Sequence, residues 1–584
     1  MIRILAPKYF LYSAYNENGE SQNGLSSDPR SDAPWLRKAG FTMMQVFRPP
    51  LPIFLAELAV ERLRRSARKL KPRQWRQAVA EIIQTIQPQK ILPSEKFQLN
   101  EFAAETVGDE LLLRALAGRI VLGNELPELY ETAGLSVPWD PERSIQPLVL
   151  QGLVQRQAAV TMDRLGLPFC RRCGATVGII EDHCLFCGNP HCLTCTQCQS
   201  MGVAKSCQPL YFQPDRTAGI VPEPFVTPKL HFELTPPQQR AATELRKFWT
   251  GDQRQFLVWA VCGGGKTEVS FGIVADVLNS GGRVLFAIPR KDIVQELYPR
   301  FREAFPETTI AAIFGGSGER FSDARLIIAT THQCLRFYQA YDLVIIDEED
   351  AFPYQGSAML HFAVQRGLKP AGKFVVMTAT PDKSIRQKLR QGELPNVTIP
   401  ARPHRQPLTV PEFIRESLRK SSARGEPPVI LQELLCQLPM NGRRLLIFLP
   451  KVSEVEEYGR QICRWAGSRG IAGSFVHAGT AQREVVKGKL LSGEFLFLVV
   501  STIYERGITI PDLDVVVLNA DFEGIFDCPT LVQIAGRAGR NGKPSRVLLI
   551  GSRKSRAVHE AIEWIRSQNA EGYRLGYLDR KIGS

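Results

Sequence analysis

Two hydrophobic patterns alternate through the second half of the chain. From Leu234 onward, short apolar runs typical of buried strands alternate with longer stretches that have the apolar spacing of helices. Strands that alternate with helices build parallel sheets with helices on their faces. We therefore expect α/β units from Leu234 to the end.

Residues 1–165 have a weaker pattern, which predicts a mainly helical region. Asn16–Asp32 is polar and is expected to form a loop. The segment ELAVERLRRSARKL (Glu57–Leu70) has a helical pattern that Pro72 should end or kink. Its basic residues either bind phosphate or form a solvated helix face, and the solvated face is the more common case.

Proline-rich breaks at Pro209–Pro228 and Pro400–Pro411 indicate the boundaries between regions. No internal repeat is evident, although the last two regions are compatible with two copies of one fold. The breaks divide the chain into an N-terminal region of unknown role, partly helical (1–165), a cysteine-rich module (166–208), a first α/β lobe (209–400) and a second α/β lobe (401–584).

The composition is basic. Lys and Arg exceed Asp and Glu by 73 − 59 = 14 among 584 residues, which favours a polyanion such as nucleic acid or an anionic membrane surface, or serves solubility alone. No apolar run approaches the roughly 20 residues that span a bilayer, and the N-terminus has no pattern of a leader peptide. We expect a cytoplasmic protein, whose clustered cysteines stay reduced and indicate metal binding.

The stretch FLVWAVCGGGKTEV (Phe256–Val269) predicts a phosphate-binding loop between a strand and a helix. Glycines allow successive N–H groups to point at a phosphate, Lys266 should reach the outer phosphates of ATP, and Thr267 should coordinate Mg²⁺. The pattern usually begins with glycine, and the small residue Ala260 takes that place here. The predicted loop residues are Gly263, Gly264, Gly265, Lys266 and Thr267.

The stretch YDLVIIDEED (Tyr341–Asp350) predicts a buried strand that ends in acidic residues. Ligands of parallel sheets bind at the C-terminal ends of the strands. We therefore expect Asp347 to hold Mg²⁺ through its water shell and Glu348 to polarise the attacking water. Together with the phosphate-binding loop, this motif predicts nucleotide hydrolysis.

Two further motifs indicate the type of ATPase. VVMTAT (Val375–Thr380) predicts a strand that ends in hydroxyl groups, and QIAGRAGR carries Arg537 and Arg540 about one helical turn apart. At this spacing both guanidinium groups lie on one face, where they can neutralise charge on a transferring phosphoryl group. With these motifs in this order, the chain resembles the superfamily 2 helicases.

This resemblance covers Leu234 to about Gly551 and implies two RecA-like lobes with ATP between them. It implies that Gln238, in LTPPQQ, recognises adenine and that nucleic acid crosses both lobes. Many relatives have aspartate two residues after the glycine of motif V, where this chain has Thr509. The implied nucleic-acid contacts are Arg290 in AIPR, Thr331 in TTHQ, His477 in VHAG and Thr502 in STIYERGI.

The chain further resembles the ComFA family of late-competence ATPases. The resemblance rests on DEEDAFPY (Asp347–Tyr354), STIYERGIT (Ser501–Thr509) and a cysteine cluster ending in CTQCQSMG (Cys195–Gly202) ahead of the lobes. It implies a motor, stimulated by single-stranded DNA, that helps to draw transforming DNA through a membrane channel together with a ComFC-like protein. A location at the inner face of the cell membrane and a homo-oligomer are compatible with it. PriA, the replication-restart helicase, has similar motifs, but its cysteines interrupt the second lobe.

Seven of the chain's 13 cysteines lie between Cys170 and Cys198, and Cys207 follows. Their Cys-x2-Cys spacing predicts tetrahedral Zn²⁺ sites that supply folding energy, and no βαβ pattern supports a redox motif instead. Eight cysteines suffice for two sites, with His183 and His191 as spare ligands. The ComFA resemblance favours Cys170, Cys173, Cys195 and Cys198 as the principal site. Cys184 and Cys187 are the next candidates, in a second site with Cys192 and Cys207.

The sequence thus predicts an ATP hydrolase with ATP, Mg²⁺ and Zn²⁺ as cofactors that moves along single-stranded DNA. Two alternatives remain open. One is a PriA-like helicase that unwinds duplex DNA in replication or repair. The other is a non-enzymatic, zinc-dependent DNA-binding scaffold.

Overall fold

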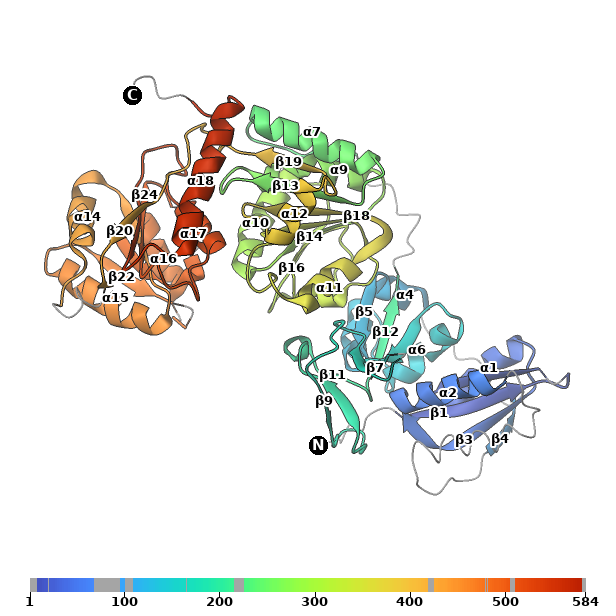
Figure 1. Ribbon diagram of the computed structural model, residues 1–584. Helices are drawn as coiled ribbons and strands as arrows, with labels where there is room; N and C mark the ends of the chain where they lie inside the picture. The colour runs from blue at the N-terminus through green and yellow to red at the C-terminus, as the bar shows by residue number, and fades with distance from the viewer. Residues whose placement is uncertain are drawn as a thin grey trace.

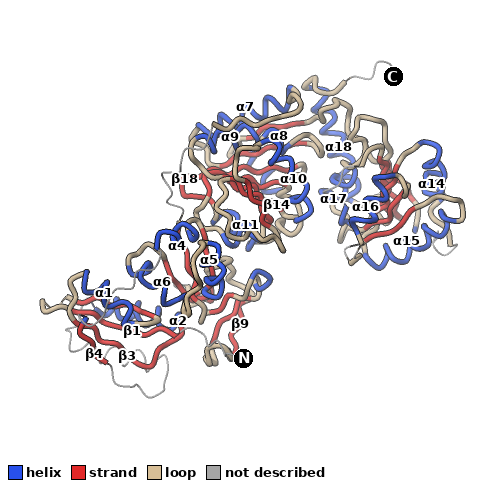
Figure 2. The backbone as a smooth tube through the Cα atoms, turned by 180° about the vertical axis from the view of Figure 1, so that it is seen from behind, coloured by secondary structure: helices blue, strands red, loops and turns tan. Residues whose placement is uncertain are grey.

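The computed structural model of the protein describes residues 8–18, 20–67, 95–99, 109–163, 165–214, 225–418, 425–477, 479–480, 482–504 and 510–579. The chain forms a row of units, with an N-terminal sheet at one end and the second α/β lobe at the other (Figure 1; Figure 2 from behind). Pro72 and most of the basic half of Glu57–Leu70 lie outside the described side chains.

The first lobe is a parallel sheet of seven strands in the order β15-β16-β14-β17-β18-β13-β19, as the alternating pattern predicts. Apolar residues fill a core on each face of this sheet. The strands are β13 (Gln255–Ala260), β14 (Val284–Ile288), β15 (Ile310–Ile313), β16 (Leu326–Thr330), β17 (Tyr341–Asp347), β18 (Leu368–Thr378) and β19 (Asn396–Ile399). The helices are α7 (Pro236–Thr250), α8 (Lys266–Val269), α9 (Phe271–Asn279), α10 (Lys291–Ala304), η4 (Gln333–Arg336), α11 (Ala358–Arg366) and α12 (Lys383–Arg390).

The second lobe is a parallel sheet of six strands in the order β20-β25-β24-β21-β23-β22. Its last helix, α18 (Arg556–Arg574), reaches the first lobe, where Trp564 packs against Trp259 with ring centroids 5.4 Å apart (Figure 1). The strands are β20 (Glu412–Arg415), β21 (Arg444–Phe448), β22 (Gly473–Val476), β23 (Phe497–Val500), β24 (Leu513–Leu518) and β25 (Val547–Gly551). The other helices are α14 (Val429–Asn441), α15 (Val452–Gly467), α16 (Arg483–Ser492), η5 (Thr502–Tyr504) and α17 (Cys528–Ala535).

The N-terminal region contains helices and also an antiparallel sheet that the sequence analysis did not predict. The sheet has the order β2-β1-β3-β4. The prediction of a loop over Asn16–Asp32 is wrong in part, because β2 pairs with β1 and a helix begins at Pro29. The elements are β1 (Lys8–Tyr15), β2 (Ser21–Ser26), α1 (Pro29–Lys38), β3 (Met43–Pro52), α2 (Ile53–Ala67) and β4 (Glu95–Gln98).

A central unit connects this sheet to the first lobe and contains the cysteines. The predicted linker Pro209–Pro228 does not begin at Pro209, because β12 (Pro209–Gln213) pairs with both β5 (Arg119–Leu122) and β6 (Gln155–Ala158). The cysteine-rich part has strands β7 (Val160–Met162), β8 (Pro168–Cys170), β9 (Ile179–Asp182), β10 (Cys192–Cys195) and β11 (Ala204–Lys205), with the short helix η3 (Gln199–Met201) between β10 and β11. The remaining helices are α4 (Asp109–Leu116), η2 (Gly123–Glu125), α5 (Leu126–Thr132) and α6 (Pro141–Leu150).

Among the described residues, no helix combines the length and the apolar character that crossing a membrane requires.

Candidate ATP site and metal centre

The predicted ATP-site residues of the first lobe meet at one edge of its sheet. In a parallel sheet the C-terminal ends of all strands lie at the same edge. The phosphate-binding loop follows β13, Asp347 ends β17, and the hydroxyl-bearing end of β18 lies between these two strands. The fold therefore brings together three motifs that are distant in sequence.

The phosphate-binding loop has the backbone conformation that its glycines allow. Gly263 and Gly265 have φ angles of +77° and +80°, which other residues rarely adopt. The Gln238 side chain donates from Nε2 to the Gly264 carbonyl at 3.0 Å and accepts at Oε1 from the backbone N–H of Thr235 at 2.9 Å. Gln238, the predicted adenine contact, is thus buried against the loop and holds it to the start of α7.

Lys266 forms a buried ion pair with both predicted catalytic carboxylates. Its Nζ lies 3.0 Å from Glu348 Oε1 and 3.3 Å from Asp347 Oδ1. Burial alone would lower the pKa of Lys266, but the two carboxylates outweigh it and raise this pKa. Burial raises the pKa of Asp347 to about 6, against the opposing effect of Lys266. Thr267, next in the loop, is also buried.

Glu348 has an unusual backbone conformation. Its φ of +58° is rare and costly for a residue with a side chain, and such strain is often found at functional sites. Its backbone N–H donates to Asp347 Oδ1 at 2.9 Å. The turn therefore directs both carboxylates toward Lys266.

Asp350 connects the acidic motif to the end of β18, a role that the sequence analysis missed. Its two oxygens accept hydrogen bonds from the hydroxyl groups of Thr378 at 2.7 Å and Thr380 at 2.6 Å. Asp350 is only 3% exposed. Both motifs were recognised from sequence, but only the fold shows that they pair.

Gln533 extends this network into the second lobe. Its Nε2 lies 3.3 Å from Asp350 Oδ2 and 3.4 Å from Glu348 Oε2, and its Oε1 accepts from the Cys262 thiol at 3.1 Å. One amide of the second lobe thus contacts both the acidic motif and the phosphate-binding loop. Gln533 is the first residue of the motif QIAGRAGR, and the motif alone does not indicate this role.

Arg402, in the break between the lobes, connects the phosphate-binding loop to the motif that contains Gln533. It does so through backbone carbonyl groups of both segments. It donates to the carbonyl oxygens of Cys262 at 2.9 Å, Ala538 at 2.7 Å and Gly536 at 2.8 Å. Arg537 and Arg540 lie in the segment that Arg402 holds, and burial lowers the pKa of both guanidinium groups. An anion would relieve the desolvation and mutual repulsion of these cations.

The four predicted nucleic-acid contacts differ in exposure. Thr331 is fully buried, so its side chain faces the interior in this conformation. Arg290 lies at the start of α10 and pairs with Asp292 at 3.0 Å. His477 Nε2 lies 3.1 Å from Glu456 Oε1, and Thr502 is half-buried on η5. Thr509, the departure from the motif V pattern, lies outside the described residues.

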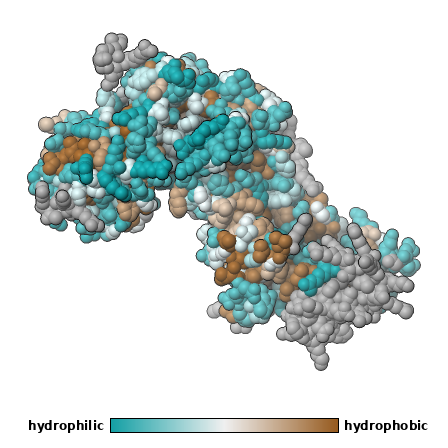
Figure 3. Space-filling model, viewed as in Figure 1, coloured by the Kyte–Doolittle hydropathy of each residue, from teal (hydrophilic) through white to brown (hydrophobic). Residues whose placement is uncertain are grey.

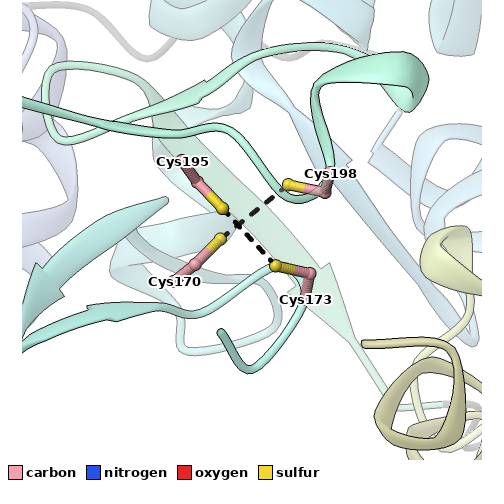
Figure 4. A group of neighbouring side chains, drawn as sticks. All are labelled: Cys170, Cys173, Cys195 and Cys198. Atoms are coloured by element: carbon pink, nitrogen blue, oxygen red, sulfur yellow. Dashed lines mark hydrogen bonds between the residues drawn. The ribbon is translucent and has the colours of Figure 1, made fainter. Parts of the chain in front are cut away.

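Four cysteine sulfur atoms point toward one another, those of Cys170, Cys173, Cys195 and Cys198 (Figure 4). The Sγ atoms of Cys170 and Cys198 lie 4.0 Å apart, and those of Cys173 and Cys195 lie 3.6 Å apart. A tetrahedral Zn²⁺ with Zn–S bonds of about 2.3 Å requires S–S distances of about 3.8 Å. The four thiols therefore fit a structural zinc ion, and no ligand position remains for water.

This group of cysteines packs directly on the first lobe. Its sulfur atoms share a hydrophobic core with residues of β17 and η4. Arg366, at the end of α11, is hydrogen-bonded to the Arg172 carbonyl between the first two cysteines, and it donates to the Leu335 carbonyl of η4 at 2.7 Å. Gln333 of η4 also contacts Met201 after the last cysteine, with Nε2 3.7 Å from the sulfur. These four cysteines are thus joined to the TTHQ motif, which ends at Gln333.

Comparison with known proteins gives matches along most of the chain. The family "Competence protein ComFA N-terminal domain" matches residues 106–212, "Type III restriction enzyme, res subunit" matches 231–383, and "Helicase conserved C-terminal domain" matches 428–542. Competence protein ComFA of Bacillus subtilis is 35% identical over 413 residues, which are 68% of this chain and 85% of that protein. The chain belongs to the ComFA family.

A second ComFA protein, from Streptococcus pneumoniae, is 34% identical over 70% of this chain and 91% of its own length. Among solved structures, S. cerevisiae Dbp5 bound to RNA and ADP BeF3 matches with a TM-score of 0.43 and 16% identity, over 59% of this chain and 96% of that chain. The three family matches leave residues 1–105 of this ComFA protein uncovered.

As a member of this family, the chain is a superfamily 2 helicase-type ATPase associated with competence, as the sequence motifs predict. Its helicase domains imply ATP and Mg²⁺ as cofactors and nucleic acid as a partner. Both described cysteine groups precede the first lobe. This order differs from the one expected of a PriA-like protein, in which cysteines interrupt the second lobe.

The contacts of Gln533 predict a catalytic defect in this ComFA protein without loss of folding. Gln533→Ala should reduce the rate of ATP hydrolysis roughly 10- to 100-fold, because hydrogen bonds to charged groups contribute about 1.5–3 kcal/mol. Steady-state ATPase assays and thermal unfolding measure the two effects. Gln391→Ala, at an exposed helix end of the first lobe, is the matched control. An unchanged rate for Gln533→Ala would show that the contact has no part in hydrolysis.

Proposed function

We propose that this protein is an ATP-driven motor, stimulated by single-stranded DNA, that draws transforming DNA across the membrane during natural competence. The main support is the contact of Gln533 with both the acidic motif and the phosphate-binding loop. Through this contact, binding or hydrolysis of ATP would directly change the position of the second lobe. Membership of the ComFA family supports the link to competence.

In this proposal, Lys266 exchanges its carboxylate partners for the phosphates of ATP. Asp347 then holds Mg²⁺ and Glu348 orients the attacking water, while Thr267 completes the metal site. Bound Mg²⁺ supplies positive charge that neutralises the phosphates during transfer. Arg537 and Arg540 contribute charge from the second lobe, where Arg402 holds their backbone against the loop.

Single-stranded DNA would cross both lobes and contact Arg290, Thr331, His477 and Thr502, mainly through its phosphates. Such contacts are independent of base sequence, and affinity should fall as salt rises. Because Thr331 is buried, its contact would come from the backbone or require a change of conformation. Opening and closing of the lobes would move the strand.

Cys170, Cys173, Cys195 and Cys198 would hold Zn²⁺ in this motor. The ion would stabilise the module that supports η4, and thereby the TTHQ motif next to the proposed DNA path. We place the motor at the inner face of the cell membrane. There it would work with the membrane DNA channel and a ComFC-like protein, and it could act as a homo-oligomer.

The rate of ATP hydrolysis with and without single-stranded DNA tests the proposal. The DNA should raise the rate of the native protein. Lys266→Ala should abolish hydrolysis while DNA binding persists, because Lys266 is the cation that pairs with both Asp347 and Glu348. Lys247→Ala, on the exposed face of α7, is the control. Full hydrolysis by Lys266→Ala would refute the assignment of the ATP site, and unchanged rates with DNA would refute the DNA motor.

A forked DNA duplex separates the motor from its alternatives. Strand separation would favour a PriA-like helicase, whereas ATP-dependent movement without separation is the result expected here. DNA binding without any ATP hydrolysis would indicate a zinc-dependent scaffold.

Loss of the first metal group should weaken the response to DNA more than ATP hydrolysis itself. Cys170→Ser with Cys173→Ser should lower the zinc content and reduce stimulation by single-stranded DNA severalfold, because η4 loses its support. The basal ATPase rate should fall less than this stimulation, since the hydrogen bonds of the module to the first lobe involve η4 and α11 rather than the phosphate-binding loop. Metal analysis and ATPase titrations with DNA measure this, and Cys436→Ser, on the exposed face of α14, is the control. Unchanged zinc would refute the ligand assignment.

A further inference from the structure

The other four clustered cysteines form a second group that is separate from the first. The Sγ atoms of Cys184, Cys187, Cys192 and Cys207 all lie within 4.8 Å of one another, and three of the four residues are buried. No sulfur atom belongs to both groups. From these positions we propose that the protein holds a second structural Zn²⁺, bound by these four thiolates.

The first evidence is that the second group repeats the local backbone geometry of the first. In CRRCG, the N–H of Gly174 donates to the Cys170 carbonyl at 2.8 Å, and the N–H of Cys170 donates to the Ala175 carbonyl at 2.9 Å. In CLFCG, Gly188 donates to Cys184 at 2.8 Å, and Cys184 donates to Asn189 at 3.0 Å. Gly174 and Gly188 also share a left-handed conformation, with φ angles of +75° and +73°. Both turns therefore present their two sulfur atoms in the same way.

The second evidence is a set of polar groups around the sulfur atoms. Lys205 Nζ lies 3.7 Å from Cys184 Sγ, and Ser206 Oγ lies 3.4 Å from Cys192 Sγ. The Ser206 hydroxyl oxygen also accepts from the N–H of Leu193 at 3.0 Å, which fixes its position. Four thiolates around Zn²⁺ carry a net charge of −2, and a nearby ammonium group and hydroxyl donor offset part of it.

The ligands of the two sites alternate along the chain, so the same backbone segments connect both sites. The ligands of the second group follow Cys173, and Cys207 comes after the first group is complete. Strand β10 begins with Cys192 of the second group and ends with Cys195 of the first. Three residues of a strand span about 10 Å, so the ions would be separate and linked by one rigid strand. Two candidate ligands from the sequence lie outside both groups, since His191 pairs with Glu181 at 2.5 Å and His183 is exposed.

The second site lies at the end of the β9–β10 hairpin, which belongs to the central unit. Figure 3 shows apolar side chains at the surface of this unit. Leu185, inside the second turn, is 92% exposed. Little apolar surface is buried around these sulfur atoms, apart from partial cover by Phe186. Metal binding would therefore supply most of the energy that folds this end of the module.

Metal content of the full-length protein tests the second site, and it does not depend on the motor function. Native protein purified without a metal-affinity step should contain two zinc ions per chain. X-ray absorption should show each ion bound by four sulfur atoms at about 2.3 Å. Cys184→Ser with Cys207→Ser should leave one ion, Cys436→Ser should leave two, and the ATPase-deficient Lys266→Ala should also leave two.

The native protein alone can overturn the proposal, even if the double variant fails to fold. Either of two results would do so: one zinc ion per chain, or nitrogen or oxygen ligands at the second ion. Reaction of Cys184 and Cys207 with a thiol reagent at the rate of Cys436 would also overturn it, because zinc-bound thiolates are protected. Loss of DNA-stimulated hydrolysis with two zinc ions retained would count against the motor alone.

Discussion

The structure depends on burying negative charge at the C-terminal end of β17. Asp347, Glu348 and Asp350 lie within four residues at this strand end, and each requires cations or hydrogen-bond donors to remain there. Lys266 serves the first two, and the hydroxyl groups of Thr378 and Thr380 serve the third. A further donor, Gln533, comes from the second lobe. The same need for partners thus assembles the ATP site and joins the lobes.

The cysteine-rich module contacts another part of the same lobe. Arg366 binds backbone carbonyls of both the module and η4, so Cys170, Cys173, Cys195 and Cys198 form one packed unit with the TTHQ motif. A change at the cysteines should therefore reach the proposed DNA path before it reaches the phosphate-binding loop. This arrangement explains why a structural metal ion would matter in a motor whose chemistry needs only Mg²⁺.

The parts of the site that could be predicted from sequence are those that depend on adjacent residues. The phosphate-binding loop, the acidic strand end and the Cys-x2-Cys turns each lie within a short segment. The pairing of Asp350 with Gln533 joins residues 183 positions apart, so no local pattern contains it. The polar sequence of the edge strand β2 predicts a loop, and only its pairing with β1 reveals a strand. The burial of Thr331 likewise follows from packing between β16 and η4 rather than from its motif.

In the proposed motor, ATP and single-stranded DNA act on the same contact between the lobes, that of Gln533. Single-molecule energy transfer between a dye on α7 and a dye on α14 measures the distance between the lobes during turnover. We expect a shorter, narrower distance distribution with Mg²⁺, a non-hydrolysable ATP analogue and single-stranded DNA than with ADP, and no such shift in Gln533→Ala. The same distribution in every nucleotide state of the native protein would show that the lobes do not respond to ATP and DNA in this way.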